Sequence, residues 1–229
     1  MRRVPPAAPH PWWLPFLCAA IPVVAVHAAW VLSTLHGYVD PCIPYLDGCA
    51  SISRVARHGH GNTLFKLLMI PCAVLQGWHW MQAGRWLERN DAGTRAATSL
   101  AWLGAIACVA LVVYASALGT EGVLYRFMRR YGITFYFASS YVAQLVFLRV
   151  LAQRVAPHLD AYRPYVRWMS AVCVGMLALG LGSVAVSAAV EHPDIKDRLE
   201  NLLEWHLGLL LTAWFALHAA LLRVRSEPH

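Results

Sequence analysis

Charge is scarce in this sequence. Only 14% of the 229 residues are Asp, Glu, Lys or Arg, whereas 59% are hydrophobic. Lysine is nearly absent, since Lys66 and Lys196 are the only two, so the net charge of +7 comes from arginine. A soluble domain of this length needs a larger charged surface, and the composition therefore excludes an ordinary soluble protein and favours an integral membrane protein.

The motifs of soluble enzymes and metalloproteins are also missing. The sequence contains no H-E-x-x-H, no G-x-S-x-G, no Walker loop, no dinucleotide fingerprint and no paired C-x-x-C. His58 and His60 flank a glycine, a spacing more typical of a solvated turn than of a metal site. We therefore expect neither a metal nor a cofactor. The basic residues lie between apolar runs rather than in one patch, which disfavours nucleic acid and favours membrane lipid as the partner.

Apolar runs of about 20 residues predict membrane-spanning helices, because a span must satisfy its backbone hydrogen bonds internally. The sequence predicts an all-α, six-helix membrane bundle that forms a single transmembrane domain over residues 1–229, with spans at 12–35, 62–84, 97–119, 132–154, 166–189 and 203–223. The second and fourth patterns are the weakest, because polar residues such as Lys66 and Gln144 interrupt them. The first run can also be interpreted as a cleavable leader ending near Ala28, but it continues past that point, which favours a span.

Basic residues and cysteines predict the orientation of the bundle in the membrane. With the N-terminus cytoplasmic, eleven Lys and Arg side chains fall on the cytoplasmic side and eight on the other, as the positive-inside tendency requires. Cys42 and Cys49 share the first loop and can close a disulfide, which needs an oxidising face; two free thiols are the alternative. We expect both termini inside and this loop outside. Because arginine-rich usage is typical of GC-rich bacterial genomes, the bacterial inner membrane is the expected location.

Ionisable side chains at membrane depth mark candidate functional sites, since burying them is costly unless they are paired or line a wet cavity. The predicted outer ends of the spans hold a set of such residues, with candidate binding roles for His36, Asp40, Arg126 and His206, and candidate catalytic roles for Glu121 and Glu204. Glu121 and Glu204 are the most plausible pair there, because one carboxylate can raise the pKa of the other and make it an acid.

His218 is a further candidate, but it lies toward the predicted inner face. It follows Glu204 by 14 residues, so the two share a helix face yet stand about 21 Å apart, too far for one small ligand to bridge. Plainer interpretations exist for both residues. Glu204 falls in the first turn of the predicted sixth span, where it would meet the positive end of the helix dipole, and a lone buried histidine is more often a packing residue than a ligand.

Three segments carry a resemblance to a known family. They are Ala50-Ser51-Ile52-Ser53 before the second span, YASALGTEGVLYRFMRRYG from Tyr114 to Gly132, and the last span from Glu204-Trp205 to Phe215-Ala216-Leu217-His218. In this order they resemble the Frag1/DRAM/Sfk1 membrane family, which includes proteins that remodel GPI anchors. The resemblance covers nearly the whole chain and implies six spans and a role in lipid handling. It places Ser51, Ser53, Glu121, Glu204 and His218 at matching positions.

The sequence also departs from that family. Met69-Ile70-Pro71-Cys72 stands where the GPI-remodelling members carry a histidine and an arginine, so that specific activity is not expected here. Three hypotheses remain. We prefer a protein that binds or remodels an acyl lipid through an outer-face intramembrane cavity. The second is a membrane-embedded acyltransferase or lipid hydrolase with Ser51 or Ser53 as nucleophile, and the third is a small-solute transporter or interaction scaffold. Whether the protein is an enzyme stays open.

Overall fold

The computed structural model describes residues 10–90, 93–155 and 160–226, and within these ranges the chain is helical and contains no strand. The long helices are α1 (Trp13–Leu35), α4 (Gly59–Arg89), α5 (Thr94–Ala117), α6 (Val123–Val150), α7 (Arg163–Ala189) and α8 (Pro193–Ser226). The short helices are α2 (Pro44–Asp47) and α3 (Ile52–Val55), with a π-helical turn at Leu151–Val155 after α6 and a 3-10 turn at Asp160–Tyr162 before α7.

Five of the long helices are long and apolar enough to cross a membrane, namely α1, α5, α6, α7 and α8. These helices indicate a polytopic membrane protein and confirm five of the expected spans. Helix α4 occupies the position of the second expected span and has 31 residues, but it is not among those five. Its polar residues, including Gln76 and His79, are buried inside the bundle. A sixth span therefore stays a prediction.

Two helices begin much earlier than expected. Helix α8 starts at Pro193 rather than at 203, and α6 starts at Val123 rather than at 132. Hydropathy marks only the apolar part of a helix, whereas Pro193 suits a helix start and the polar turn after it continues the same helix. The placement of Glu204 in the first turn of its helix is therefore wrong, because three helical turns precede it.

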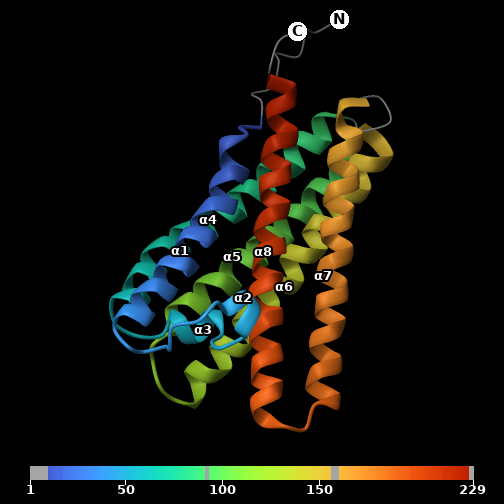
Figure 1. Ribbon diagram of the computed structural model, residues 1–229. Coiled ribbons are helices and arrows are strands. Elements are labelled where there is room, and N and C mark those ends of the chain that lie inside the picture. The colour runs from blue at the N-terminus through green and yellow to red at the C-terminus, as the bar shows by residue number, and fades with distance from the viewer. Residues whose placement is uncertain (1–9, 91–92, 156–159, 227–229) are drawn as a thin grey trace, which may run out of the picture.

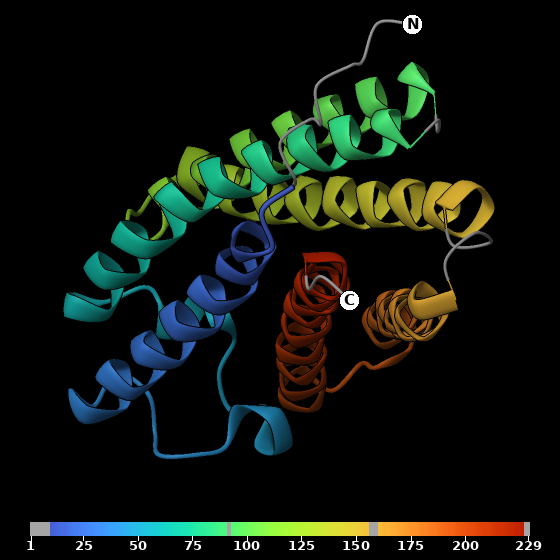
Figure 2. The same ribbon diagram turned by 90° about the horizontal axis from the view of Figure 1, so that it is seen from above.

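The helices form two groups that are tilted against each other. Seen from above, α7 and α8 are nearly end-on, whereas α1, α4, α5 and α6 cross the view (Figure 2). Helix α8 packs against both α7 and α1, and so connects the groups. Helix α1 begins and α8 ends toward the same end of the bundle, and α2, α3 and the α7–α8 turn lie at the opposite end (Figure 1). We name these the terminal end and the disulfide end.

Small residues allow α4 and α5 to pack closely. A Cβ atom at Gly104 would collide with the side chain of Trp80, and one at Gly84 would collide with the backbone of Ala97. Close approach of this kind is the usual basis of helix association in membranes, where burial from water contributes little. Trp80 is fully buried by this contact and packs against Trp214 of α8 with ring centroids 5.5 Å apart.

Candidate functional site at the disulfide end

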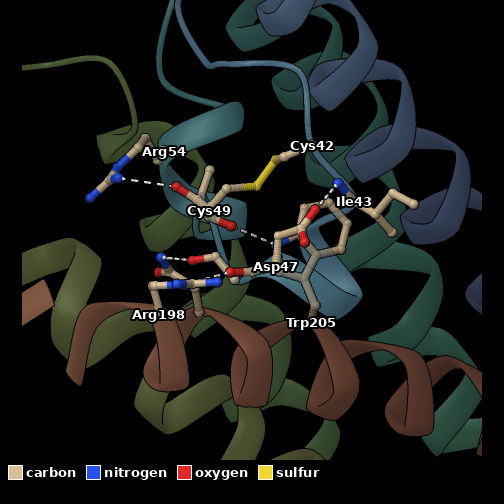
Figure 3. Close-up of a disulfide and its surroundings, with 10 residues drawn as sticks. Cys42, Ile43, Asp47, Cys49, Arg54, Arg198 and Trp205 are labelled. Atoms are coloured by element: carbon tan, nitrogen blue, oxygen red, sulfur yellow. Dashed lines mark hydrogen bonds between the residues drawn. A yellow bond between two sulfur atoms is a disulfide. The ribbon is translucent and has the colours of Figure 1, made fainter. Parts of the chain in front are cut away.

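The loop after α1 is closed by a disulfide between Cys42 and Cys49, as the sequence predicts. Inside the ring, the backbone N–H of Ile43 donates to Asp47 Oδ2 at 2.7 Å (Figure 3). Gly48 ends α2 with a φ of +60° and packs against the backbone of Arg198, where a Cβ would collide. A side chain at position 48 is therefore excluded both by backbone conformation and by space.

Helix α8 holds this loop through three side chains that reach its backbone. Arg198 Nε donates to Asp47 O at 3.0 Å, Asn201 Nδ2 to Gly48 O at 2.8 Å, and Trp205 Nε1 to Ala50 O at 2.8 Å. Figure 3 shows Arg198 and Trp205 projecting from α8 toward the loop. Asn201 and Trp205 are both buried. The loop is therefore fixed to α8 by directional bonds as well as by its disulfide.

This attachment brings α3 onto Glu204. The backbone N–H groups of Ile52 and Ser53, in the first turn of α3, donate to the Glu204 carboxylate. Ser51 precedes them as the N-cap, and its Oγ accepts from the N–H of Arg54 at 3.1 Å. Glu204 thus does meet the positive end of a helix, but that helix is α3 and not its own.

A cavity of about 900 Å³ lies beside Glu204, between α6, α7 and α8. We name it the arginine cavity, because Arg57, Arg126, Arg129 and Arg130 line it. Glu200 and Glu204 contribute the acidic groups, and the remaining lining consists of hydroxyl, glycine and apolar residues: Ser53, Tyr114, Ile133, Thr134, Phe137, Gly180, Ser183, Val184, Ser187 and Leu207. Its size falls in the range of small-molecule binding sites.

Arg129 is already held in place within this cavity. Its guanidinium donates to Ala117 O at 3.0 Å and to Thr120 O at 2.7 Å, and so satisfies carbonyls at the end of α5. Within the described residues, the ion pairs that the structure shows are Arg54–Asp197 and Arg163–Asp160, and neither involves a residue that lines the arginine cavity.

A smaller cavity of about 60 Å³, lined almost entirely by apolar side chains, adjoins the arginine cavity. Tyr114, Glu204, Ile133 and Phe137 line both cavities. The Tyr114 hydroxyl is buried there without a hydrogen-bond partner. We name this second space the apolar cavity. Because the two spaces share residues, a ligand with a polar and an apolar part can contact both.

His27 and Tyr45 also line the apolar cavity, and neither lines the arginine cavity. The His27 Nδ1–H donates to Val23 O at 2.7 Å, which leaves Nε2 to accept from the Tyr45 hydroxyl at 3.2 Å. Both rings pack on Trp205, with centroids 5.7 and 5.1 Å from the indole. Burial raises the pKa of Tyr45 above its ordinary value.

The structure brings only some of the predicted site residues together. Glu204, Ser53 and Arg126 line the arginine cavity. Glu121 is exposed in the turn between α5 and α6 and is not among the lining residues of either cavity, so the structure does not show the expected pair of Glu121 with Glu204. Ser51 and Ser53 lie together, with their hydroxyls 3.1 Å apart.

The other predicted binding residues lie outside these cavities. His36 is exposed and stacks on Tyr38, with ring centroids 6.2 Å apart, and Asp40 is exposed in the same loop. His206 turns its ring toward Tyr45, with centroids 5.7 Å apart, and bonds to Leu202 O within α8. None of these three side chains lines either cavity beside Glu204.

His218 belongs to a separate cluster near the terminal end. Its ring lies 5.0 Å from that of His79 and 5.5 Å from that of His10, centroid to centroid, and all six ring nitrogens are buried without a hydrogen-bond partner. Burial, with a smaller contribution from the nearby charge of Arg89, lowers the pKa of His10 to about 4. Among the residues that the structure describes, no group of three or more His, Cys, Asp or Glu is arranged to hold a metal ion.

Much of the arginine cavity was not predicted from the sequence. Arg57, Arg129, Arg130 and Tyr114 were not among the candidates, although Arg126, Arg129 and Arg130 stand at i, i+3 and i+4 and must share one helix face. That spacing could have identified them. Their convergence with Arg57 depends on how α3 packs, which no local pattern encodes.

Comparisons with known proteins do not assign the chain to a family. No protein-family model, no curated protein and no solved structure matches it. The resemblance to the Frag1/DRAM/Sfk1 family therefore stays a prediction, and the function must be inferred from the site itself.

Proposed function

We propose that this polytopic membrane protein binds an acyl lipid in the arginine cavity, with the headgroup near Glu204 and the acyl chain between α6 and α7. The main support for the proposal is the lining of this one cavity, which combines arginines and glutamates with apolar side chains of α6, α7 and α8 such as Phe137, Val184 and Leu207. A small polar solute would leave the apolar part unused, and an acyl chain alone would leave the charged part unsatisfied.

The side of the cavity formed by α7 is open enough to admit a lipid tail. Helix α7 is the least buried of the five candidate spans, and Leu177, Leu181 and Val184 on it are exposed. Helix α7 packs mainly against α8 and only weakly against α6. A tail can therefore enter sideways from the bilayer between α6 and α7, without passing through the core.

The disulfide supports an outer-leaflet site. A bond between Cys42 and Cys49 persists in an oxidising compartment, and the loop that carries it is attached to α8 beside Glu204. If that loop faces the oxidising side, the arginine cavity opens in the leaflet of that side.

A substitution at Gly180 tests the proposal. Gly180 of α7 lines the cavity, and a Cβ atom there meets no other atom within 4 Å, so Gly180→Phe should place a ring in the cavity without disturbing the fold. We expect native mass spectrometry to show co-purified acyl lipid on the unsubstituted protein and markedly less on Gly180→Phe.

Gly182→Phe on the same helix is the matched control. Gly182 does not line the cavity, and the nearest atom to its Cβ position is Leu203 Cδ2 at 4.0 Å. This variant should keep its lipid. Equal lipid retention by both variants, or an unsubstituted protein that purifies without lipid from a native-membrane extract, would refute the proposal.

A further inference from the structure

The arginine cavity carries more positive charge than an acyl lipid alone requires. Four arginines face two glutamates there, and three of the arginines project from one side of α6. Arg57 and Arg126 are both close enough to Arg129 to interact with its charge. Like charges gathered in a partly apolar site destabilise it unless an anion lies among them.

The glutamates do not neutralise this cluster. The Glu204 carboxylate accepts the N–H groups of Ile52 and Ser53, and no ion pair joins either glutamate to an arginine within the described residues. Arg129 Nη1 donates to the backbone carbonyls of Ala117 and Thr120, which are neutral acceptors and leave the guanidinium charge without a counter-ion in the part of the chain that the structure describes. The structure therefore holds four arginine side chains around the cavity without pairing them with acidic side chains among the residues it describes.

Two buried donors in this region have no partner. Arg57 Nε is buried without a hydrogen-bond acceptor, and so is the Tyr114 hydroxyl at the boundary with the apolar cavity. Buried donors are almost always satisfied in folded proteins, so an unpaired pair beside a cavity indicates a ligand that accepts hydrogen bonds.

We infer that the headgroup of the bound lipid carries a phosphate, which lies between Arg57 and the arginine face of α6 and accepts from Tyr114. This inference rests on the proposed function and specifies its ligand. Planar guanidinium groups match the oxygens of a phosphate in geometry as well as in charge. A headgroup without phosphate offers neither the charge nor the number of acceptors.

Lipid-binding titrations by native mass spectrometry test the inference. The probes are dioleoyl phosphatidylglycerol, dioleoyl phosphatidylethanolamine, dioleoylglycerol, and glycerol 3-phosphate as the phosphate without a tail. We expect both phospholipids to bind at least about tenfold more tightly than dioleoylglycerol, the scale of one or more charge-assisted hydrogen bonds. Glycerol 3-phosphate should bind weakly, because it lacks the chain.

The double variant Arg126→Gln, Arg130→Gln should weaken phosphatidylglycerol binding about tenfold or more and leave dioleoylglycerol binding unchanged. Arg54→Gln is the matched control, since Arg54 lies at the same end but does not line the cavity and bonds instead to Cys49 O. It should change neither affinity.

The outcomes separate the two proposals. Dioleoylglycerol binding as tightly as phosphatidylglycerol, or a double variant with unchanged phosphatidylglycerol affinity, overturns the phosphate inference and leaves lipid binding intact. Failure of every lipid to bind overturns both. Glycerol 3-phosphate that binds as tightly as the phospholipids supports a phosphate site but overturns its use for a lipid.

Discussion

The attachment of the disulfide loop to α8 can be tested by replacing Trp205 with Phe. The substitution removes the indole N–H that donates to Ala50 O at 2.8 Å and keeps an aromatic ring beside His27 and Tyr45. Ala50 and Trp205 are both buried, so the carbonyl loses its partner without gaining access to water. An acceptor left in this way costs about 1–3 kcal/mol, and the smaller ring adds about 1 kcal/mol for lost burial.

Thermal unfolding in detergent measures this cost. A thiol-reactive fluorophore is a suitable reporter once Cys108, which is only partly buried, is replaced by Ser, because Cys18, Cys72 and Cys173 are buried and become reactive only when the bundle opens. A loss of about 2–4 kcal/mol should lower Tm by roughly 4–16 °C for a domain of this size. Hydrogen exchange of residues 43–53 should accelerate more than exchange in the core, since the loop opens first.

Trp102→Phe is the control for this experiment. Trp102 is 69% exposed on α5, so the same change there should alter stability by less than about 0.5 kcal/mol. The attachment of the loop to α8 would be refuted if Trp205→Phe had the same Tm as Trp102→Phe and if residues 43–53 exchanged at the rate of the unsubstituted protein.

Three further perturbations address the loop and the histidine cluster. Replacing Cys42 and Cys49 by Ser should cost about 2–3 kcal/mol, the loop-closure value for so short a ring, and loss of stability on reduction of the unsubstituted protein should match it. The pKa of His10 is lowered from 6.5 to about 4, so the folded protein favours neutral His10, and its free energy of unfolding should fall as the pH drops from 6.5 toward 4, by about 3 kcal/mol at most. Hydrogen exchange around His10 should accelerate over that pH range, and a His10→Phe variant should not show the acceleration. His218→Leu should stabilise the bundle by about 1–3 kcal/mol, because both ring nitrogens are buried unpaired, and a destabilised variant would show that an ordered water or ion satisfies them.

The sequence predicts the helices better than it predicts their ends. Apolar length locates five of the six long helices, because a hydrophobic run of about 20 residues has few other structures to adopt, whereas α4 corresponds to a weaker pattern that polar residues interrupt. Hydropathy does not detect the polar part of a helix that extends out of the membrane. The start of α8 at Pro193 was therefore not predicted, and Glu204 was wrongly placed in the first turn of its helix. The Cys42–Cys49 disulfide was predictable because both cysteines lie in one short loop.

The candidate site was only partly predictable, for a reason of packing. Glu204 was selected as a costly charge at membrane depth, and the structure places it beside the arginine cavity. Its partners are backbone N–H groups of α3, which every residue but proline possesses and which no sequence pattern distinguishes. Glu121 was selected by the same argument but is exposed, because the turn after α5 carries it out of the bundle. Catalysis by Ser51 or Ser53 stays a prediction.

Photo-crosslinking gives the most direct test of lipid binding at the arginine cavity. The protein is reconstituted with phosphatidylglycerol that carries a diazirine in one acyl chain, irradiated, digested and mapped by mass spectrometry. We expect saturable labelling of the cavity walls at 133–137 of α6 and 180–187 of α7, which excess unlabelled phosphatidylglycerol suppresses and Gly180→Phe abolishes. Labelling spread evenly over exposed positions such as Trp102, Val109 and Trp168, without saturation, would contradict lipid binding in the cavity.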